Sequence, residues 1–155
     1  MNAPMARAPW WYWAVAVLAL LWMLLGVFAW IMDLRMTPEQ LATLAPGQQQ
    51  LYAARPQWVF VVYAIAVFSG LAGAIGLLLR KRWATTYFLV SLIAVVIQFG
   101  YTLFVMDAIG VLGAGMALPF PLVIIAFAVF LLWFARYARR HGWIAGGGAA
   151  NATLA

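Results

Sequence analysis

The sequence contains no cysteine, a single histidine and only three acidic residues. Without cysteine, the chain has no structural disulfide, no thiolate nucleophile and no thiolate metal site. It also shows no nucleophile–base pair, no cluster of metal-ligating residues, no phosphate-binding loop and no dinucleotide fingerprint. We therefore expect a protein that is not an enzyme and that holds no metal and no cofactor.

Charged residues make up only 8% of the chain, whereas hydrophobic residues make up 68%. A soluble domain usually contains about 45–50% apolar residues, so lipid is the expected solvent of this chain. Helices are favoured over strands, because a helix satisfies its own backbone polar groups in hydrocarbon. Each of the four apolar runs is close to the length of about 17–25 residues that crosses a bilayer as a helix. The runs are residues 11–32, 58–79, 83–106 and 118–135.

We therefore expect an all-α bundle of four antiparallel transmembrane helices in one domain, residues 1–143. Residues 144–155 are rich in glycine and alanine and are expected to form a disordered cytoplasmic tail. The first run could instead be a signal peptide, since Arg7 precedes it. It is longer than the apolar core of about 7–15 residues found in secretory signals, so we expect an uncleaved helix.

The few charges are distributed unevenly about the four runs. Seven basic residues flank the runs on one side, and the three acids lie on the other. By the positive-inside rule the basic side faces the cytoplasm, so we expect both termini there. Because the basic residues form short clusters beside the membrane, we expect contacts with anionic lipid headgroups and no nucleic-acid partner. These contacts are expected from Arg80, Lys81, Arg82, Arg139 and Arg140.

The first outer loop has the pattern of a helix start. Thr37 is placed as the N-cap, Pro38 at the first helical position and Gln40 for a reciprocal capping box. We expect a short helix to about residue 45, a break at Pro46 and then a second turn or two. These pieces would lie flat on the membrane surface or cap the bundle.

Glycines lie in the loop between the third and fourth runs, and tryptophans lie beside the ends of several runs. The second outer loop, residues 107–117, contains three glycines and is expected to be flexible. Tryptophans beside the runs, such as Trp11, Trp58 and Trp143, are expected to anchor the helices at the membrane surface.

Small residues spaced three or four apart mark the second run as a packing surface. Such residues let helix backbones approach closely, which drives helix association in lipid. The seam consists of Ala66, Gly70, Gly73 and Gly76. It faces either another helix of the same chain or a second copy, so a homo-oligomer stays open.

Gln98 is the only strongly polar side chain deep inside a run, and an amide in lipid needs hydrogen-bond partners. One interpretation is an interhelical hydrogen bond, worth about 0.6–2 kcal/mol. The other is a polar pocket that binds a neutral ligand. The candidate substrate-binding residues are Gln98, Tyr101, Thr102, Tyr63, Ser69 and Ser91.

Asp33 and Asp107 lie at the outer ends of the first and third runs. Two neighbouring carboxylates could share a proton or bind a cation. Arg35 and Arg55 offer a simpler alternative, and we expect surface ion pairing or plain solvation of these carboxylates.

Several short motifs mark the stretch from Trp22 to Trp143. They are Phe28-Ala29-Trp30-Ile31-Met32, Met36-Thr37-Pro38-Glu39, Leu78-Leu79-Arg80-Lys81-Arg82-Trp83-Ala84, Ser91-Leu92-Ile93 and Trp133-Phe134-Ala135-Arg136. In these motifs the chain resembles a group of small four-helix bacterial inner-membrane proteins that automatic naming often labels sugar transporters. The resemblance implies a multi-pass protein of the bacterial inner membrane, without catalytic residues.

Two functions are compatible with this resemblance. One is a small oligomeric transporter of a polar neutral solute such as a sugar. The other is a non-transporting accessory or structural protein that binds a partner membrane protein or lipid. A roomy polar cavity that reaches Gln98 would favour transport, and a dry, closely packed bundle would favour the accessory role.

Overall fold

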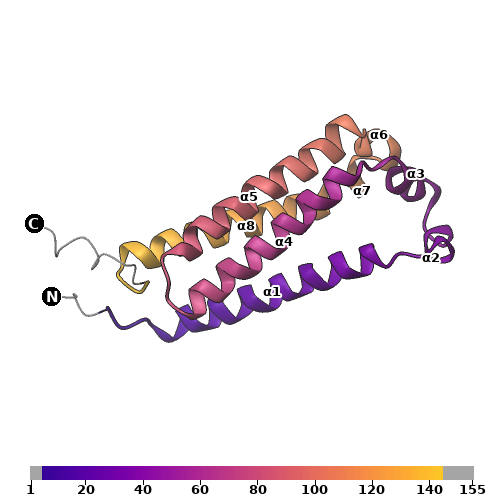
Figure 1. Cartoon of the computed structure of the whole chain (residues 1–155). Coiled ribbons are helices and arrows are strands. Elements are labelled where there is room, and N and C mark those ends of the chain that lie inside the picture. The colour runs from indigo at the N-terminus through magenta and orange to yellow at the C-terminus, as the bar shows by residue number, and fades with distance from the viewer. Residues whose placement is uncertain (1–4, 145–155) are drawn as a thin grey trace, which may run out of the picture.

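The computed structural model describes residues 5–144, which fold almost entirely into helices (Figure 1). Four helical segments in this range are long and apolar enough to cross a membrane. They are built on α1 (Trp10–Leu34), α4 (Gln57–Leu78), α5 (Trp83–Gly100), which continues as a π-helical turn at Tyr101–Val105, and α8 (Pro119–Arg140). No β-strand is present among residues 5–144, and the predicted all-α fold with four spans is confirmed.

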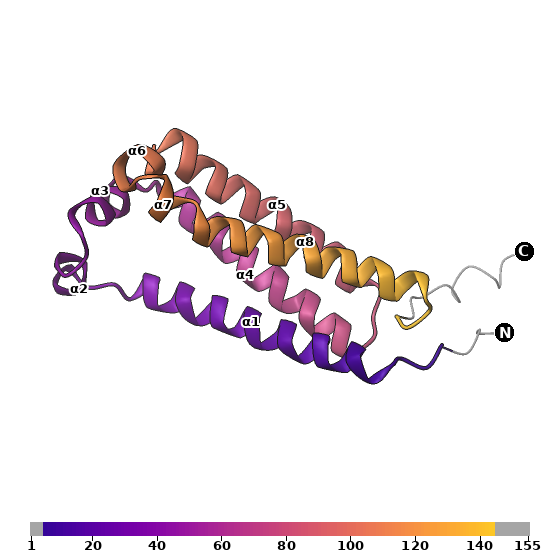
Figure 2. The same ribbon diagram turned by 180° about the vertical axis from the view of Figure 1, so that it is seen from behind.

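The four spans run antiparallel. Helix α4 packs against both α1 and α5, and α8 packs against α5. The start of α1, the α4–α5 connection and the end of α8 lie together at one end of the bundle, here named the terminal end (Figure 2). The short helices lie at the opposite end, the loop end. Both views show α1 diverging from the other spans toward the loop end.

The small-residue seam of α4 is packed inside the chain, mainly against α5. A Cβ atom added to Gly73 would lie 2.9 Å from the ring of Phe88, and one added to Gly76 would lie 2.8 Å from the Cβ of Ala84. At Gly70 the nearest atom is the sulfur of Met23 on α1. Of the two predicted alternatives, the structure therefore has the seam joining α4 to its neighbours in the same chain.

At the terminal end, Tyr12 is fully buried and its hydroxyl donates to the backbone carbonyl of Leu77 at 2.5 Å. Trp143, predicted as a membrane anchor, packs edge-on against Trp11 with ring centroids 5.1 Å apart. Phe134 stacks on Tyr12 from α8. These aromatic side chains join α1, α4 and α8 and close this end of the bundle.

Arg80 holds both terminal segments in place. It ends α4 with a positive φ of 55°, and Lys81 N–H donates to the carbonyl of Gly76 at 2.8 Å. The Arg80 guanidinium donates from Nε to the carbonyl of Trp143 and from Nη2 to that of Ala6, both at 2.6 Å. The sequence predicts a headgroup contact for Arg80, whereas here two of its donors are used inside the chain.

The other basic residues of the predicted headgroup set are exposed at the terminal end. They are Lys81, Arg82, Arg139 and Arg140. Their contact with anionic lipid stays a prediction. Helix α8 carries two of them, because it continues to Arg140, five residues beyond the predicted end of the span. The apolar run predicts where the membrane ends, and arginine continues a helix readily beyond that point.

The loop end begins with the predicted capping box. The Thr37 hydroxyl accepts from Gln40 N–H at 3.2 Å, and the Gln40 side chain accepts from Thr37 N–H at 3.1 Å. The resulting helix α2 (Pro38–Ala42) ends three residues before the predicted position. Residues 43–45 separate it from the next helix, and Pro46, predicted as the break, is instead the first residue of α3 (Pro46–Ala54).

The prediction of a flexible second outer loop is wrong. Residues 108–117 form α6 (Ala108–Leu112) and α7 (Ala114–Ala117), joined by Gly113 at a φ of 84°. Asp107 caps α6, since its carboxylate accepts from Gly110 N–H at 3.1 Å. Leu51 of α3 packs against the buried cluster of α6 and α7, so these helices cap the bundle.

The predicted tail lies almost wholly outside the described residues. Its first residue, Ile144, is buried against the aromatic residues of the terminal end. The core thus includes one residue that the sequence assigns to the tail.

Candidate ligand cavity

A cavity of about 370 Å³ lies between α1, α4, α5 and α8, in the half of the bundle nearer the loop end. This volume is at the lower end of the range of about 300–1,000 Å³ typical of small-molecule sites. Apolar side chains form most of its wall. Its polar side chains are Tyr63 on α4 and Ser91 and Gln98 on α5, and Trp22 on α1 adds an indole N–H.

The structure thus brings together three of the six predicted substrate-binding residues, Tyr63, Ser91 and Gln98. It does not place Ser69, Tyr101 or Thr102 in the cavity wall. Their role in binding, and that of the other three, stays a prediction.

The residues outside the cavity wall have other partners. The Ser69 hydroxyl donates to carbonyls of its own helix, at Ile65 and Ala66. The Tyr101 ring packs edge-on against Trp58, with centroids 4.6 Å apart.

The sequence offers an interhelical hydrogen bond as one interpretation of Gln98. In the structure, Ser91 makes such a bond instead. Its hydroxyl donates from α5 to the carbonyl of Ala66 on α4 at 2.8 Å, and the side chain is buried. The Gln98 amide, by contrast, makes no hydrogen bond with any residue in the described part of the chain. Gln98 therefore presents a free donor and a free acceptor at the cavity.

A π-helical turn follows Gln98 and was not foreseen from the sequence. Met106 N–H donates to the carbonyl of Tyr101 at 3.0 Å, five residues back. The Thr102 hydroxyl donates to the carbonyl of Gln98 at 2.9 Å. Turns of this kind are rare and are frequently found at functional sites. The threonine four residues after Gln98 is the only local signal we find for it.

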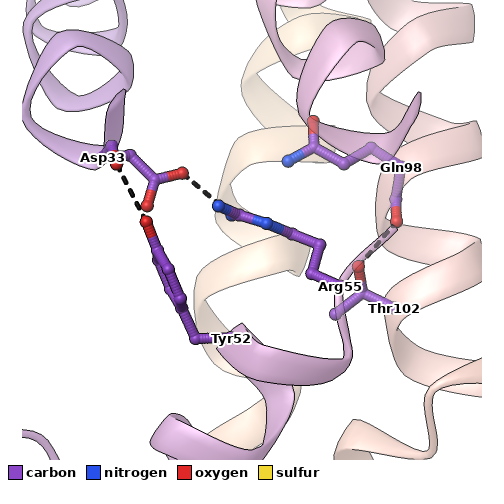
Figure 3. A network of polar contacts seen from close by, with 5 residues as sticks. All are labelled: Asp33, Tyr52, Arg55, Gln98 and Thr102. Carbon is purple, nitrogen blue, oxygen red and sulfur yellow. Dashed lines mark hydrogen bonds and ion pairs between the residues drawn. The ribbon is translucent and has the colours of Figure 1, made fainter. Parts of the chain in front are cut away.

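A polar network at the loop end joins α1 to α3 (Figure 3). The Asp33 carboxylate pairs with the Arg55 guanidinium at 2.8 Å, and the Tyr52 hydroxyl donates to the Asp33 carbonyl at 2.9 Å. The guanidinium also lies over the rings of Tyr52 and Phe60, at 4.7 and 5.3 Å from their centroids. Figure 3 shows the side chains of Arg55 and Gln98 extending in the same direction, toward α1.

The two outer aspartates therefore have different partners. Asp33 pairs with Arg55, and Asp107 caps α6. Within residues 5–144 no three histidine, cysteine or acidic side chains lie close enough together to hold a metal ion. The role of Tyr52 was missed, because its aromatic ring and hydroxyl sit in a loop helix whose position the sequence does not fix.

Burial raises the pKa of the Tyr52 phenol, and the negative charge of Asp33 raises it further. We expect Tyr52→Phe to lower the free energy of unfolding by about 1 kcal/mol at neutral pH, through loss of the hydrogen bond. A raised pKa means that the wild-type hydroxyl stabilises the fold below its unfolded pKa of about 10 and loses this effect as the pH rises through the folded pKa.

The measurement is thermal unfolding of both forms in nanodiscs at neutral and strongly alkaline pH. The difference between them should shrink at alkaline pH, where the wild-type hydroxyl ionises and can no longer donate. A difference that grows with pH would contradict the assigned hydrogen bond.

No family model, no curated protein and no solved structure matches this chain.

Proposed function

We propose that this protein is a multi-pass carrier of the bacterial inner membrane that binds a small neutral solute in the cavity between its four spans. The unpaired amide of Gln98 supports this most directly. The Gln98 side chain is only half-buried, so a ligand in the cavity can reach its amide, and a hydrogen bond to it would contribute about 0.5–1.5 kcal/mol. The proposed role is binding and transfer rather than catalysis.

A neutral solute is favoured by the charge of the cavity wall. Among residues 5–144, no acidic or basic side chain lines it, and Tyr63 is the only titratable residue in its wall. A charged ligand would enter this apolar space without a counter-ion, at a large desolvation cost. A sugar is a neutral solute too, but most of its hydroxyl groups would face apolar walls.

The accessory role remains the second candidate, and the packing of the terminal end favours it. Tyr12, Leu77 and Phe134 are almost completely buried there, and Arg80 ties both terminal segments across that end. The cavity lies in the half of the bundle nearer the loop end and does not extend into this packed core. Transport across the membrane therefore requires the core to open. A protein that only binds a ligand or a partner has no such requirement.

Homo-oligomerisation through the glycine seam is not needed for the cavity. The seam is covered within the chain, and residues of one chain alone form the cavity wall. A carrier based on this cavity is therefore complete as a monomer.

The absence of cysteine from the sequence permits a direct test of access to the cavity. Ala128 and Ala138 are both buried on α8, but only Ala128 lines the cavity. We expect N-ethylmaleimide to modify an Ala128→Cys variant at least about tenfold faster than Ala138→Cys, a difference of about 1.4 kcal/mol in access.

Rates would be measured by mass spectrometry in nanodiscs, after thermal unfolding shows that both variants are folded. Adding Gln98→Leu to Ala128→Cys should leave the cavity reachable and keep the fast rate. Equal, slow modification at both positions would contradict an accessible cavity and leave the accessory role as the better conclusion.

A further inference from the structure

The lipid-facing side of the cavity shows how a ligand reaches it. Leu25 of α1 and Phe120 of α8 both line the cavity, yet 64% and 67% of their surfaces are exposed. Leu25 lies well inside the apolar run of α1, where an exposed side chain faces lipid, and Phe120 lies at the loop end of α8. The cavity therefore opens toward the bilayer between α1 and α8.

The other side of α1 is closed. The ring of Trp30 stacks on Phe60 of α4, with centroids 5.3 Å apart, and packs edge-on against Phe68. The Asp33–Arg55 pair joins α1 to the α3–α4 connection at the loop end. These contacts close the α1–α4 boundary in the half of the bundle that holds the cavity.

Two stacked aromatic rings border the opening between α1 and α8 on the side nearer the terminal end. There the rings of Trp22 and Phe127 stack with centroids 4.5 Å apart. Beyond this stack toward the loop end, no hydrogen bond joins α1 to α8 among the described residues. Trp22 also lines the cavity, so the Trp22–Phe127 stack forms the end of the opening that is nearer the terminal end.

The chemistry of the wall matches a molecule that comes from lipid. Most of the surface is apolar, and its polar side chains are Tyr63, Ser91 and Gln98, with the indole N–H of Trp22 as a further donor. The Ser91 hydroxyl already donates to the carbonyl of Ala66. These few groups in a mostly apolar wall suit one hydroxyl or carbonyl better than the several hydroxyls of a sugar.

We propose that the ligand is a lipid-soluble molecule with one neutral hydrogen-bonding head group, such as a long-chain alcohol, which enters from the bilayer between α1 and α8. Gln98 and Tyr63 bind the head group, and the apolar wall takes the chain. This inference rests on the proposed function and defines the class of its ligand.

The test uses a decanol with a photoreactive diazirine on its alkyl chain, added to the full-length protein in nanodiscs. The same decane without the hydroxyl and a photoreactive glucose serve as comparison probes. Labelled peptides are mapped by mass spectrometry in the wild type, in Gln98→Leu and in Ile97→Leu. Ile97 is the neighbouring residue and is exposed on the lipid side of α5.

We expect the decanol probe to label residues 22–29 and 120–128 in the wild type and in Ile97→Leu. Labelling should fall about tenfold in Gln98→Leu, as loss of one well-formed hydrogen bond predicts. The decane probe should label these segments at the reduced level in all three proteins.

Three outcomes would overturn the inference. Equal decanol labelling in the wild type and Gln98→Leu would show simple partitioning into lipid. Labelling by the glucose probe that depends on Gln98, with none by decanol, would overturn the ligand class and leave the carrier proposal standing. Absence of Gln98-dependent labelling by both probes, in proteins that unfold at the wild-type temperature, would overturn both.

Discussion

Replacing Gly73 with leucine is expected to lower the free energy of unfolding by about 3 kcal/mol, at the upper end of the usual cost of overpacking. Even the first carbon of a new side chain at this position would lie 2.9 Å from the ring of Phe88. Both residues are buried between α4 and α5, so neither helix can move away without losing the rest of the seam. Thermal unfolding and size-exclusion chromatography in nanodiscs would measure the effect.

Gly100 provides the matched control, since it is also a helical glycine in a span. A Cβ atom added there meets nothing within 4 Å. Gly100→Leu should therefore unfold close to the wild-type temperature. If Gly73→Leu instead keeps its stability and only changes from a dimer to a monomer, the seam joins two copies, and the assignment to one chain is wrong.

Replacing Arg80 with alanine is expected to release both terminal segments and to lower the free energy of unfolding by about 2 kcal/mol, the usual worth of hydrogen bonds to a charged group. The variant loses the bonds from the guanidinium to the carbonyls of Ala6 and Trp143. Hydrogen exchange should become about tenfold faster at residues 5–9 and 141–144, because local opening becomes easier there.

A second variant separates the hydrogen bonds from the backbone conformation. Arg80→Gly loses the guanidinium as well but accepts the positive φ of 55° without strain. It should therefore show the same fast exchange as Arg80→Ala with a smaller loss of stability. Unchanged exchange in both variants would mean that the aromatic cluster alone holds the terminal segments.

The sequence predicts the spans well because one physical requirement dominates them. A helix that crosses lipid needs a continuous apolar run of known length, and a charge or proline at its end is easily recognised. The capping box at Thr37 is equally local, since all its donors and acceptors lie within four residues. The four spans and the capping box are present as predicted, although α8 continues five residues beyond the predicted end of its span.

Contacts between distant segments were not predictable in the same way. The helices α6 and α7 form where three glycines suggest a flexible loop. Asp107 caps α6 locally, and Leu51 of α3 packs against both helices from a distant part of the sequence. Arg80 is read as one member of a basic cluster, and only the fold brings Ala6 and Trp143 within its reach.

The cavity could be predicted from the sequence only in part. Gln98 stands out in the sequence because an amide is expensive in lipid, and Tyr63 and Ser91 can be proposed beside it. Which of its neighbours share the cavity depends on the rotation of α5 about its axis and on the π-helical turn, and neither follows from hydropathy. Hence Ser91 faces the cavity, whereas Thr102 donates to the backbone of its own helix.

Native mass spectrometry of the protein purified from its host membrane tests the binding role of the cavity most directly. We predict one small neutral molecule bound per chain in the wild type and in Ile97→Leu, and its loss in Gln98→Leu. The mass of the released molecule would then identify the ligand. A bare chain in all three proteins, or the same bound mass in Gln98→Leu, would contradict the assignment of Gln98 and its cavity as a ligand site.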